Sequence, residues 1–525
     1  MAQAIVLAVG GIVCKIIGAV YRIPLTNALG AEGIGLYQMV YAVYALFIVL
    51  SCGGMTSAVS RLVAEDSANG LSGRRHVRVG IIISIATASF AAVLLMLLNS
   101  QIGILQGNSD CSTGYLIIAP SIIFVSVSSV IKGYFQGRLN MLPTTVSNLI
   151  EQILKLSLGL GLAFYLVKIN LKYALYGTLF AVSASELIAM VFLSIAYFTV
   201  RRRERKLMHK NSLRNDVKYQ KGELKKFWGV VIPFTFLSVV LPLSSMIDSF
   251  LIVNLLKANA GVAEATALYG IYSGQVTTLI NMPIMVLISL AASIVPSMSK
   301  ERELLNLDGI LLKTRLSVKL CLLIGIPVMV FFMFYNYEVM SILYPKLGEA
   351  AIKVGASLIV VMSPCLIATS LAEIIGAILS ALDKIYDSAL SMLLGVALKT
   401  VIILTMTATL GIMAAAIGSL LLSVTALTIN SVLLTKQIGY RKEMIKGIGI
   451  ITFGSAVIAL ISLLNKLIFV NIYLQVALSV LIGGTVYFFL ITAFDVFTTD
   501  ETKSLPMSGF LIKTRNRLRF WDGEV

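Results

Sequence analysis

The chain has 525 residues, of which 58% are hydrophobic and 13% are charged, and its net charge is +17. Soluble globular proteins average about 25% charged residues, so this composition, with a mean hydropathy of +0.93, excludes a soluble protein and predicts an all-α polytopic membrane protein. A β-barrel is excluded as well, because it needs alternating strands of about 10 residues, whereas this chain has long apolar runs. The positive charge does not indicate nucleic-acid binding, since it follows the loops between these runs.

Fourteen apolar windows are long enough to cross a membrane, which takes about 20 residues each. The first six are 3–25, 34–60, 79–99, 115–135, 143–167 and 172–199. The next six are 228–256, 266–296, 314–336, 350–380, 386–407 and 411–434, and the last two are 447–467 and 471–496. We therefore expect about fourteen transmembrane helices.

Lysine and arginine are distributed unevenly between the two sets of loops. Of the 42 such residues, 31 lie in one set, and only Lys168, Lys172, Lys257, Lys346 and Lys466 lie in the other. Cytoplasmic loops carry the excess of positive residues. The asymmetry therefore predicts that both termini are cytoplasmic, and its regularity supports the number of spans.

The basic loop near the middle of the chain is the expected boundary between two lobes. The chain is predicted to consist of a six-helix lobe, a basic cytoplasmic loop, a second six-helix lobe, a pair of C-terminal helices and a basic cytoplasmic tail. These parts are residues 1–199, 200–227, 228–434, 435–496 and 497–525. The basic loop is typical of a topology determinant, and binding of anionic membrane lipids is the alternative.

An internal repeat supports the two lobes. An offset of 244 residues aligns Pro120 with Pro364, and Leu154-Lys155 with Leu398-Lys399. Six helices preserve the chain direction, so the repeats would be related by an axis along the membrane normal. Two repeats with a site between them are typical of alternating-access transporters.

Apart from charged residues close to the ends of the predicted spans, nine charged residues inside them are candidates for a role within the membrane. They are Lys15, Arg22, Glu151, Lys155, Glu186, Asp248, Lys319, Glu373 and Lys399. A charge in the hydrocarbon core costs roughly 3 kcal/mol or more, so such residues usually face a bundle interior or a water-filled cavity. A cationic cavity in a many-helix protein indicates a transporter for an anionic molecule.

Four of the cations are predicted to bind the substrate. Lys15 and Arg22 are seven residues apart, which places them on one face of the first helix. Lys155 and Lys399 occupy equivalent positions in the two repeats. The alternatives are snorkelling to an interface for Lys15 and Arg22, and a structural ion pair for Lys155, which has Glu151 one turn before it.

Three acidic residues are predicted to couple transport to an ion gradient. Asp248, Glu373 and Glu186 could each bind a proton or a sodium ion, and a salt bridge to a nearby cation is the alternative for each. Lys319 lies near the end of its span, so we expect it to snorkel to the surface. With five cysteines and two histidines in no ligand or catalytic spacing, we expect no enzyme, no metal site and no cofactor beyond a coupling Na⁺ or H⁺.

Several motifs resemble a known group of transporters. The segment Lys15-Ile-Ile-Gly-Ala-Val-Tyr-Arg22-Ile-Pro-Leu and the segment Leu29-Gly-Ala-Glu-Gly-Ile-Gly-Leu-Tyr-Gln38 are similar to the start of its members. Gly133-Tyr-Phe-Gln-Gly137 and Leu268-Tyr-Gly-Ile-Tyr-Ser-Gly274 fit the same pattern. The chain thus resembles the stage V sporulation protein B and lipid II flippase-like group of the multidrug/oligosaccharidyl-lipid/polysaccharide exporter superfamily, over roughly residues 5 to 500.

The resemblance implies two six-helix lobes, an extra C-terminal helix pair with a groove for a lipid tail, and a bacterial plasma-membrane location. It implies the flipping of undecaprenyl-pyrophosphate-linked cell-wall precursors, chiefly lipid II, driven by membrane potential or an ion gradient. Basic residues of helix 1 line the cavity in related flippases, and Lys15 and Arg22 match them. Arginines on helices 2 and 8 of relatives are absent here, where Gly274-Gln275 occupy the helix 8 site.

Two other functions stay open. One is a flippase for another lipid-linked saccharide, from capsule or teichoic acid synthesis, because these molecules share the pyrophosphate and the prenyl tail. The other is a cation-coupled exporter of cationic drugs. A drug exporter would need acidic and aromatic cavity walls, and Lys15 and Arg22 argue against it.

Overall fold

The computed structural model describes residues 2–69, 71–208, 221–292, 298, 301–302, 304, 306–382, 384–439, 447–494, 496–497 and 501. Within these residues every regular element is a helix, and thirteen helical segments are long and apolar enough to cross a membrane. The first of them, Ile16–Ala68, has 53 residues. At 1.5 Å per residue it would span about 80 Å, more than twice a hydrocarbon core of about 30 Å, so it accounts for two crossings. The predicted all-α polytopic fold is confirmed.

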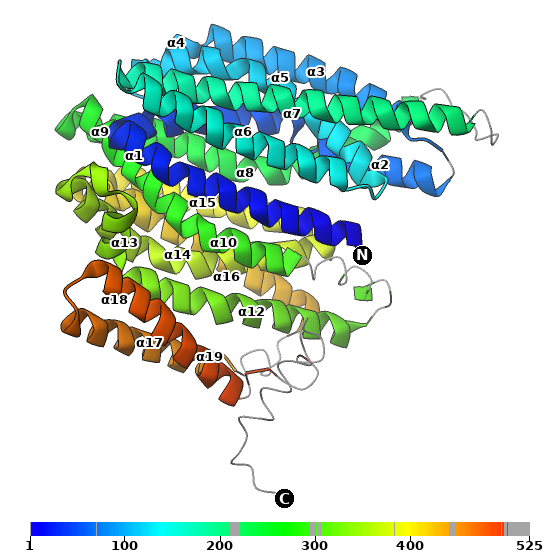
Figure 1. Cartoon of the computed structure of the whole chain (residues 1–525). Coiled ribbons are helices and arrows are strands. Elements are labelled where there is room, and N and C mark those ends of the chain that lie inside the picture. Colours follow the sequence, from blue (N-terminus) through cyan, green and yellow to red (C-terminus); the bar gives the residue numbers. More distant parts are fainter. Residues whose placement is uncertain are drawn as a thin grey trace, which may run out of the picture. The chain divides into compact units, whose positions relative to one another are not determined.

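The residues form two compact units, the first comprising Met1–Thr278 and Lys399–Ala415. Its helices run alongside one another (Figure 1). They are α1 (Ala2–Cys52), α2 (Met55–Ala68), α3 (Arg74–Leu97), α4 (Asn99–Leu105), η1 (Ser109–Cys111), α5 (Ser112–Gly137), α6 (Leu142–Leu166), α7 (Leu171–Met208), α8 (Lys221–Ala260), α9 (Val262–Tyr269) and the π-helical segment η2 (Gly270–Val276).

The second unit comprises Leu279–Leu398 and Ala416–Val525. Three helices contribute residues to both units, α10 (Thr277–Ala292), α15 (Ile385–Leu410) and α16 (Met413–Ile438). The others are α12 (Leu307–Phe334), α13 (Asn336–Leu343), η3 (Pro345–Leu347), α14 (Glu349–Ala381), α17 (Ile448–Ile468), α18 (Ile472–Leu478), the π-helical segment η5 (Ser479–Gly483) and α19 (Gly484–Ala493). The five predicted parts of the chain, residues 1–199, 200–227, 228–434, 435–496 and 497–525, stay a prediction.

Two glycine-containing breaks divide the first 68 residues. Gly30 has φ 69° and ψ −177°, a conformation open to glycine, and it separates the two membrane crossings within α1. The helix ends at Cys52, and α2 begins at Met55 beyond Gly53-Gly54. The predicted loop at 26–33 is therefore a one-residue kink, and the predicted second span stops eight residues earlier than expected.

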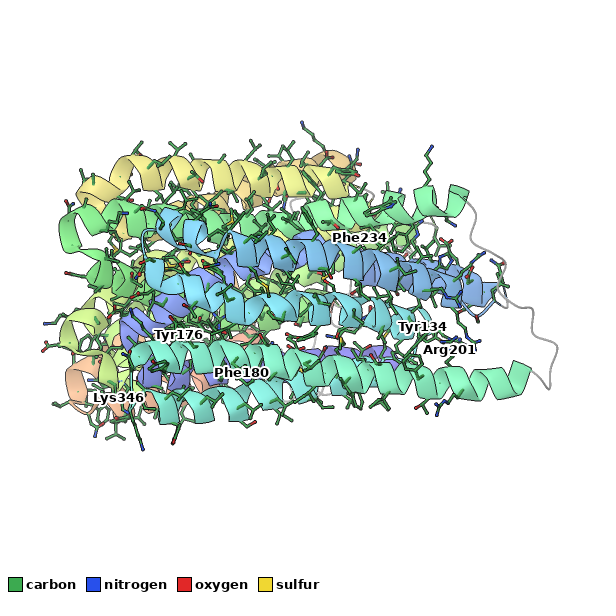
Figure 2. The ribbon with its side chains drawn as sticks, turned by 90° about the horizontal axis from the view of Figure 1, so that it is seen from above. Tyr134, Tyr176, Phe180, Arg201, Phe234 and Lys346 are labelled. Carbon is green, nitrogen blue, oxygen red and sulfur yellow. The ribbon has the colours of Figure 1, made fainter. Side chains whose placement is uncertain are left out.

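The packing of α5 against α2 depends on two glycines. A Cβ atom at Gly133 would lie 2.7 Å from the Thr56 carbonyl oxygen, and one at Gly137 would lie 2.4 Å from that of Ser60. Small residues let membrane helices approach closely. Inside a membrane, van der Waals contacts rather than the hydrophobic effect hold such helices together. Tyr134 lies between these glycines, and Figure 2 shows it toward the same end of the unit as Arg201 of α7.

The C-terminal helix pair is tied to α12 by a buried ion pair. The Lys319 ammonium donates to both carboxylate oxygens of Glu501, at 2.7 and 3.0 Å, and to the Val496 carbonyl at 3.1 Å. The side chains of Lys319 and Glu501 have no solvent exposure. The expectation that Lys319 snorkels is therefore wrong, because the carboxylate of Glu501, five residues beyond the last predicted span, pairs with it.

Two further polar contacts join the C-terminal helix pair to the second unit, one at α12 and one at α13. The Tyr487 hydroxyl on α19 donates to the Leu323 carbonyl at 2.7 Å. Near the opposite end of α12, Lys466 of α17 pairs with Glu338 at 2.7 Å. Polar contacts between helices hold membrane bundles together where the hydrophobic effect is absent, so α17 and α19 are fixed parts of the second unit.

Candidate functional site

Arg22 lies on α1 beside a proline. Pro24 lacks the amide hydrogen that would bond the Val20 carbonyl, which loosens the helix at this turn. The Thr26 hydroxyl donates to the Arg22 carbonyl at 2.8 Å. The guanidinium of Arg22 reaches the first turn of α10 and donates to the Thr278 hydroxyl at 2.8 Å.

The partner of Arg22 is neutral. The side chain of Arg22 is partly buried, and no ion pair involves it among the described residues. A guanidinium keeps its charge in proteins and can donate five hydrogen bonds, so one hydroxyl satisfies little of it. Lys15 lies on the same helix, but its side chain is outside the described part of the structure, so its predicted role stays a prediction.

The π-helical segment η2 packs directly against the second half of α1. A Cβ atom at Gly270 would lie 2.2 Å from the Ala31 carbonyl oxygen and 3.0 Å from the Cα atom of Gly35. The amide of Gln38 donates to the Ser273 carbonyl at 3.1 Å. Isolated π-helical turns occur often at functional sites, and this one links α1 to the start of α10.

Gln275 is an unpaired buried amide in this segment. Its side chain has no solvent exposure, and neither its Nε2 nor its Oε1 atom has a hydrogen-bond partner in the described structure. Burying an amide without a partner costs about 1–3 kcal/mol. Gln275 precedes Thr278 by three residues in the chain. We call Arg22 and its partner Thr278, together with Gln275, the cation site.

Asp248 and Lys399 form a buried ion pair within the first unit. The Nζ atom of Lys399 lies 2.5 Å from Oδ2 of Asp248. The Tyr272 hydroxyl, which η2 supplies, lies 3.4 Å from the same carboxylate and 3.2 Å from the ammonium. One predicted substrate-binding residue and one predicted coupling residue are thus brought together, and η2 contacts both this pair and the cation site.

Lys155 holds two carboxylates. Its Nζ atom lies 2.7 Å from Glu151 on the same helix, α6, and 2.9 Å from Glu186 on α7. The three side chains are between 10% and 14% exposed. The ion pair between Glu151 and Lys155, which the spacing predicts as an alternative, is confirmed, and Glu186 joins it. The predicted roles of Lys155 in substrate binding and of Glu186 in coupling stay predictions.

Glu373, the third predicted coupling residue, lies on α14 in the second unit and is partly buried. No group of three or more His, Cys, Asp and Glu side chains that could hold a metal ion occurs among the described residues. The predicted coupling by Na⁺ or H⁺ stays a prediction.

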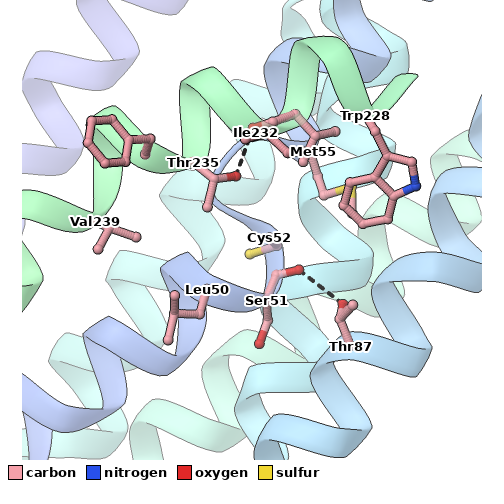
Figure 3. Close-up of a pocket in the computed structure, with 11 residues that line it drawn as sticks. Leu50, Ser51, Cys52, Met55, Thr87, Trp228, Ile232, Thr235 and Val239 are labelled. Carbon is pink, nitrogen blue, oxygen red and sulfur yellow. Dashed lines mark hydrogen bonds between the residues drawn. The ribbon is translucent and has the colours of Figure 1, made fainter. Parts of the chain in front are cut away.

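A separate pocket of about 330 Å³ lies at the Gly53-Gly54 break (Figure 3). It is lined by α8, α3 and the end of α1, with Trp228, Ile232 and Leu50 among its walls. The Thr87 hydroxyl on its wall donates to the Ser51 carbonyl at 3.1 Å, and the described residues that line the pocket include no charged one. The pocket is therefore unsuited to an anionic group.

Two members of the cation site carry little signal in the sequence. Thr278 is a neutral residue in an apolar span, and only the fold brings it to Arg22. In the sequence, Gln275 is visible only because relatives are expected to have a basic residue at its position. That its amide is buried without a partner is known from the structure, where it lies in a π-helical turn. No residue pattern distinguishes such a turn from an α-helical one. Gly270 and Gly274, with Gly35 on α1 itself, are the sequence signal for the close approach of α1.

Known proteins resemble this chain over most of its length. Stage V sporulation protein B of Bacillus subtilis (strain 168) is 27% identical over 522 residues, which cover 97% of this chain and 98% of that protein. Lipid II flippase MurJ of the same strain is 24% identical over 420 residues, which cover 76% of this chain and 75% of that protein.

Solved structures share the fold. Lipid II flippase MurJ in an inward closed conformation superposes with a TM-score of 0.71 at 14% identity and covers 94% of this chain and 99% of that chain. An inward-facing multidrug resistance transporter of the MATE family and the MOP superfamily has a TM-score of 0.66 at 12% identity, covering 81% of this chain and 94% of that one. The resemblance read from the motifs is confirmed, and the protein is a multi-pass membrane protein.

Residues 1–301 match the family described as polysaccharide biosynthesis protein. This match covers more than half of the chain. The chain belongs to the polysaccharide biosynthesis protein family.

Proposed function

We propose that this protein is a flippase that moves an undecaprenyl-pyrophosphate-linked cell-wall precursor to the outer leaflet, with lipid II as the first candidate. The observation that carries the proposal is Arg22, a membrane-embedded cation bonded only to the neutral Thr278 among the described residues. By contrast, the membrane-embedded lysines Lys155, Lys319 and Lys399 each form an ion pair with a carboxylate.

A pyrophosphate suits this environment physically. It carries at least two negative charges, which the hydrocarbon core excludes. A guanidinium binds phosphate oxygens bidentately, and each charge-assisted hydrogen bond contributes about 1.5–3 kcal/mol. The unpaired amide of Gln275 supplies two further donors. Lys15 is proposed to add a second cation from the same helix.

The ion pair of Asp248 and Lys399 offers a coupling step. In the pair the two charges cancel, so Lys399 has little net attraction for an anion. A proton or a sodium ion on Asp248 would compete with the ammonium, and Lys399 would then present its charge to the substrate. This step would connect the two roles predicted for these residues. Lys155 could act in the same way through Glu186.

The proposed topology places both termini in the cytoplasm, because the positive loops lie on that side. Two lobes, residues 1–199 and 228–434, would alternate access to the site between the leaflets. The pyrophosphate would cross within the protein while the prenyl tail stays in lipid. We propose no catalytic step, since flipping breaks no bond.

A flippase for a different lipid-linked saccharide is the second candidate. Gln275 stands where a basic residue is expected from the resemblance, which reduces the positive charge facing the substrate. A less charged site favours a head group with fewer acidic groups than lipid II. A capsule precursor with neutral sugars meets this description while keeping the pyrophosphate, whereas the phosphodiesters of a teichoic acid precursor add negative charge.

The test is a flipping assay with purified protein in proteoliposomes. Fluorescent lipid II, a lipid-linked capsule repeat and fluorescent phosphatidylcholine are supplied in turn, and the fraction accessible from outside is followed. The proposal expects transport of at least one pyrophosphate-linked lipid and none of phosphatidylcholine. Equal transport of all three, or of phosphatidylcholine alone, would contradict it, and transport of the capsule repeat but not lipid II would favour the second candidate.

A further inference from the structure

The second half of α1 carries three tyrosines in contact, Tyr37, Tyr41 and Tyr44. The rings of Tyr37 and Tyr41 stack with their centroids 5.8 Å apart and an angle of 16° between their planes. The ring of Tyr44 meets that of Tyr41 edge-on, with the centroids 5.7 Å apart. The hydroxyl of Ser121 on α5 donates to the hydroxyl of Tyr44 at 2.7 Å. The ring of Tyr41 is therefore held between two neighbours, one of which is anchored to another helix.

Tyr41 is the member of this group with an uncovered side. Tyr37 and Tyr44 are buried, and between residues 33 and 46 only Tyr41 and Ala45 have partly exposed side chains. These two residues are one helical turn apart and share one face of α1. A helix that faced lipid would expose side chains at every turn of this stretch. The face of Tyr41 and Ala45 is therefore turned to the interior of the bundle, and the small alanine leaves room beside the tyrosine ring.

Charged groups adjoin this face. Lys155 of α6 is close enough to Tyr41 to interact with it electrostatically. The ammonium of Lys155 lies 2.7 Å from Glu151 and 2.9 Å from Glu186, and all three side chains keep an exposed edge of 10–14%. An ammonium donates hydrogen bonds and a carboxylate accepts them. The cluster can therefore satisfy hydroxyl groups, which do both.

An aromatic face beside such donors and acceptors suits a sugar. A pyranose ring has a face of C–H bonds that packs on the negative face of an aromatic ring, and its hydroxyls project around the rim toward polar groups. Both parts are present here, with the ring of Tyr41 at an apolar contact and Lys155 with its carboxylates next to it. A flat apolar ligand would have no use for the charged groups.

The tyrosines also adjoin the cation site. Arg22 and Lys155 both interact electrostatically with Tyr37, and the ring of Tyr37 stacks on that of Tyr41. In an undecaprenyl-pyrophosphate-linked saccharide, the first sugar is bonded directly to the pyrophosphate. A pyrophosphate at Arg22 therefore brings that sugar to the neighbouring tyrosines without a spacer.

We propose that Tyr41 stacks against the sugar that is linked directly to the pyrophosphate, while Lys155 and its two carboxylates bond the hydroxyls of this sugar. This inference rests on the proposed function, because it assigns the sugar of the same substrate. Tyr41 then determines specificity, since it distinguishes a lipid-linked saccharide from a lipid pyrophosphate that carries no sugar.

The test compares the affinity of the full chain in detergent for two ligands, undecaprenyl pyrophosphate and undecaprenyl pyrophosphate linked to one N-acetylglucosamine. Tyr41→Ala should weaken the binding of the sugar-linked lipid about 2- to 12-fold, as expected for the loss of one aromatic stacking contact. The affinity for undecaprenyl pyrophosphate should stay that of the wild type. Tyr41→Phe, which retains the ring, should retain the preference for the sugar-linked lipid.

The matched control is Tyr176→Ala. Tyr176 is a partly exposed tyrosine of the same unit, on α7, and it is labelled in Figure 2. This variant should bind both ligands as the wild type does. Melting temperatures report the folding of each variant. If Tyr41→Ala fails to fold, Tyr41→Leu, which keeps the apolar bulk without an aromatic ring, should show the same selective loss.

Four results would overturn the proposal. Wild-type affinity of Tyr41→Ala for the sugar-linked lipid would remove the ring from sugar recognition. Equal loss of both ligands in Tyr41→Ala would mean that the residue supports the whole site, and the same selective loss in Tyr176→Ala would mean that the effect is not specific to Tyr41. Binding of neither ligand by the wild type would contradict the proposed function itself, and the role of Tyr41 with it.

Discussion

The ammonium of Lys399 lies 2.5 Å from the carboxylate of Asp248, and both side chains are less than 10% exposed. These residues are 151 positions apart in the chain, on α15 and α8. Two opposite charges that are buried together stabilise each other, and removing one leaves the other uncompensated.

We expect either Asp248→Asn or Lys399→Met to lower the free energy of unfolding by about 3–5 kcal/mol, because a lone charge stays buried. The double variant Asp248→Leu/Lys399→Met should recover most of this stability. Unfolding in detergent measures all three. A double variant as unstable as the sum of the single ones would mean that the two residues do not act as a pair.

The same two residues are proposed to couple flipping to an ion gradient, which can be tested separately from stability. The double variant Asp248→Leu/Lys399→Met should fold and still bind the lipid substrate, while its flipping no longer responds to an imposed proton or sodium gradient. Flipping rates in proteoliposomes with and without a gradient provide the measurement. A gradient response equal to that of the wild type would exclude Asp248 as the coupling group.

Arg22→Ala should reduce flipping by about 10- to 150-fold, which corresponds to the loss of one charge-assisted contact of about 1.5–3 kcal/mol. Arg22→Lys keeps the charge and loses the bidentate geometry, so it should fall between the wild type and Arg22→Ala. Arg78→Ala, at an exposed position, is the control and should flip as the wild type does. An unchanged rate in Arg22→Ala would remove this residue from the site.

The substitution Gln275→Ala should raise the stability of the protein while it lowers the flipping activity. It removes a buried unpaired amide, so the melting temperature should rise, and it removes two donors from the substrate, so flipping should slow. Gln38→Ala is the matched control, because the Gln38 amide is bonded to the Ser273 carbonyl and its loss should lower the melting temperature. If Gln275→Ala lowered the melting temperature to the same extent, its amide would be paired.

Gly270→Ala should destabilise the first unit by about 1–3 kcal/mol, because its Cβ atom would lie 2.2 Å from a backbone oxygen of α1. Gly161→Ala in α6 has no atom within 4 Å of its Cβ position and should be neutral or slightly stabilising. Thermal unfolding of both variants checks the close packing of η2 on α1. If Gly270→Ala and Gly161→Ala melted at the same temperature, the backbones of η2 and α1 could move apart without loss of stability.

Glu501→Gln should loosen the C-terminal helix pair, because Lys319 would lose its carboxylate while staying buried. Hydrogen exchange of α17 and α19 should speed up. Lys319→Met/Glu501→Met, which removes both charges, should restore protection. Wild-type exchange in Glu501→Gln would mean that the tail does not secure these helices.

The spans could be predicted because hydrophobicity decides them locally. The predicted span 350–380 and the helix Glu349–Ala381 differ by one residue at each end. The ion pair of Glu151 and Lys155 could also be predicted from the sequence, since one helical turn separates the two residues. These features depend on neighbours within a few residues.

The partners of Lys319, Lys399 and Arg22 depend on tertiary packing. Glu501 follows Lys319 by 182 residues, and Thr278 follows Arg22 by 256 residues. The charges of these residues indicate that each needs a partner inside the membrane. Which partner each obtains is decided by helix packing, which hydropathy does not encode.

The most direct measurement is the rescue of a bacterium that is depleted of its own lipid II flippase. The cells express this protein as wild type, Arg22→Ala or Arg78→Ala at matched levels, and lipid II in the outer leaflet is quantified. The account predicts rescue by the wild type and by Arg78→Ala, and loss of rescue by Arg22→Ala. Full rescue by Arg22→Ala would contradict the cation site, and no rescue by well-expressed wild type would contradict lipid II as the substrate.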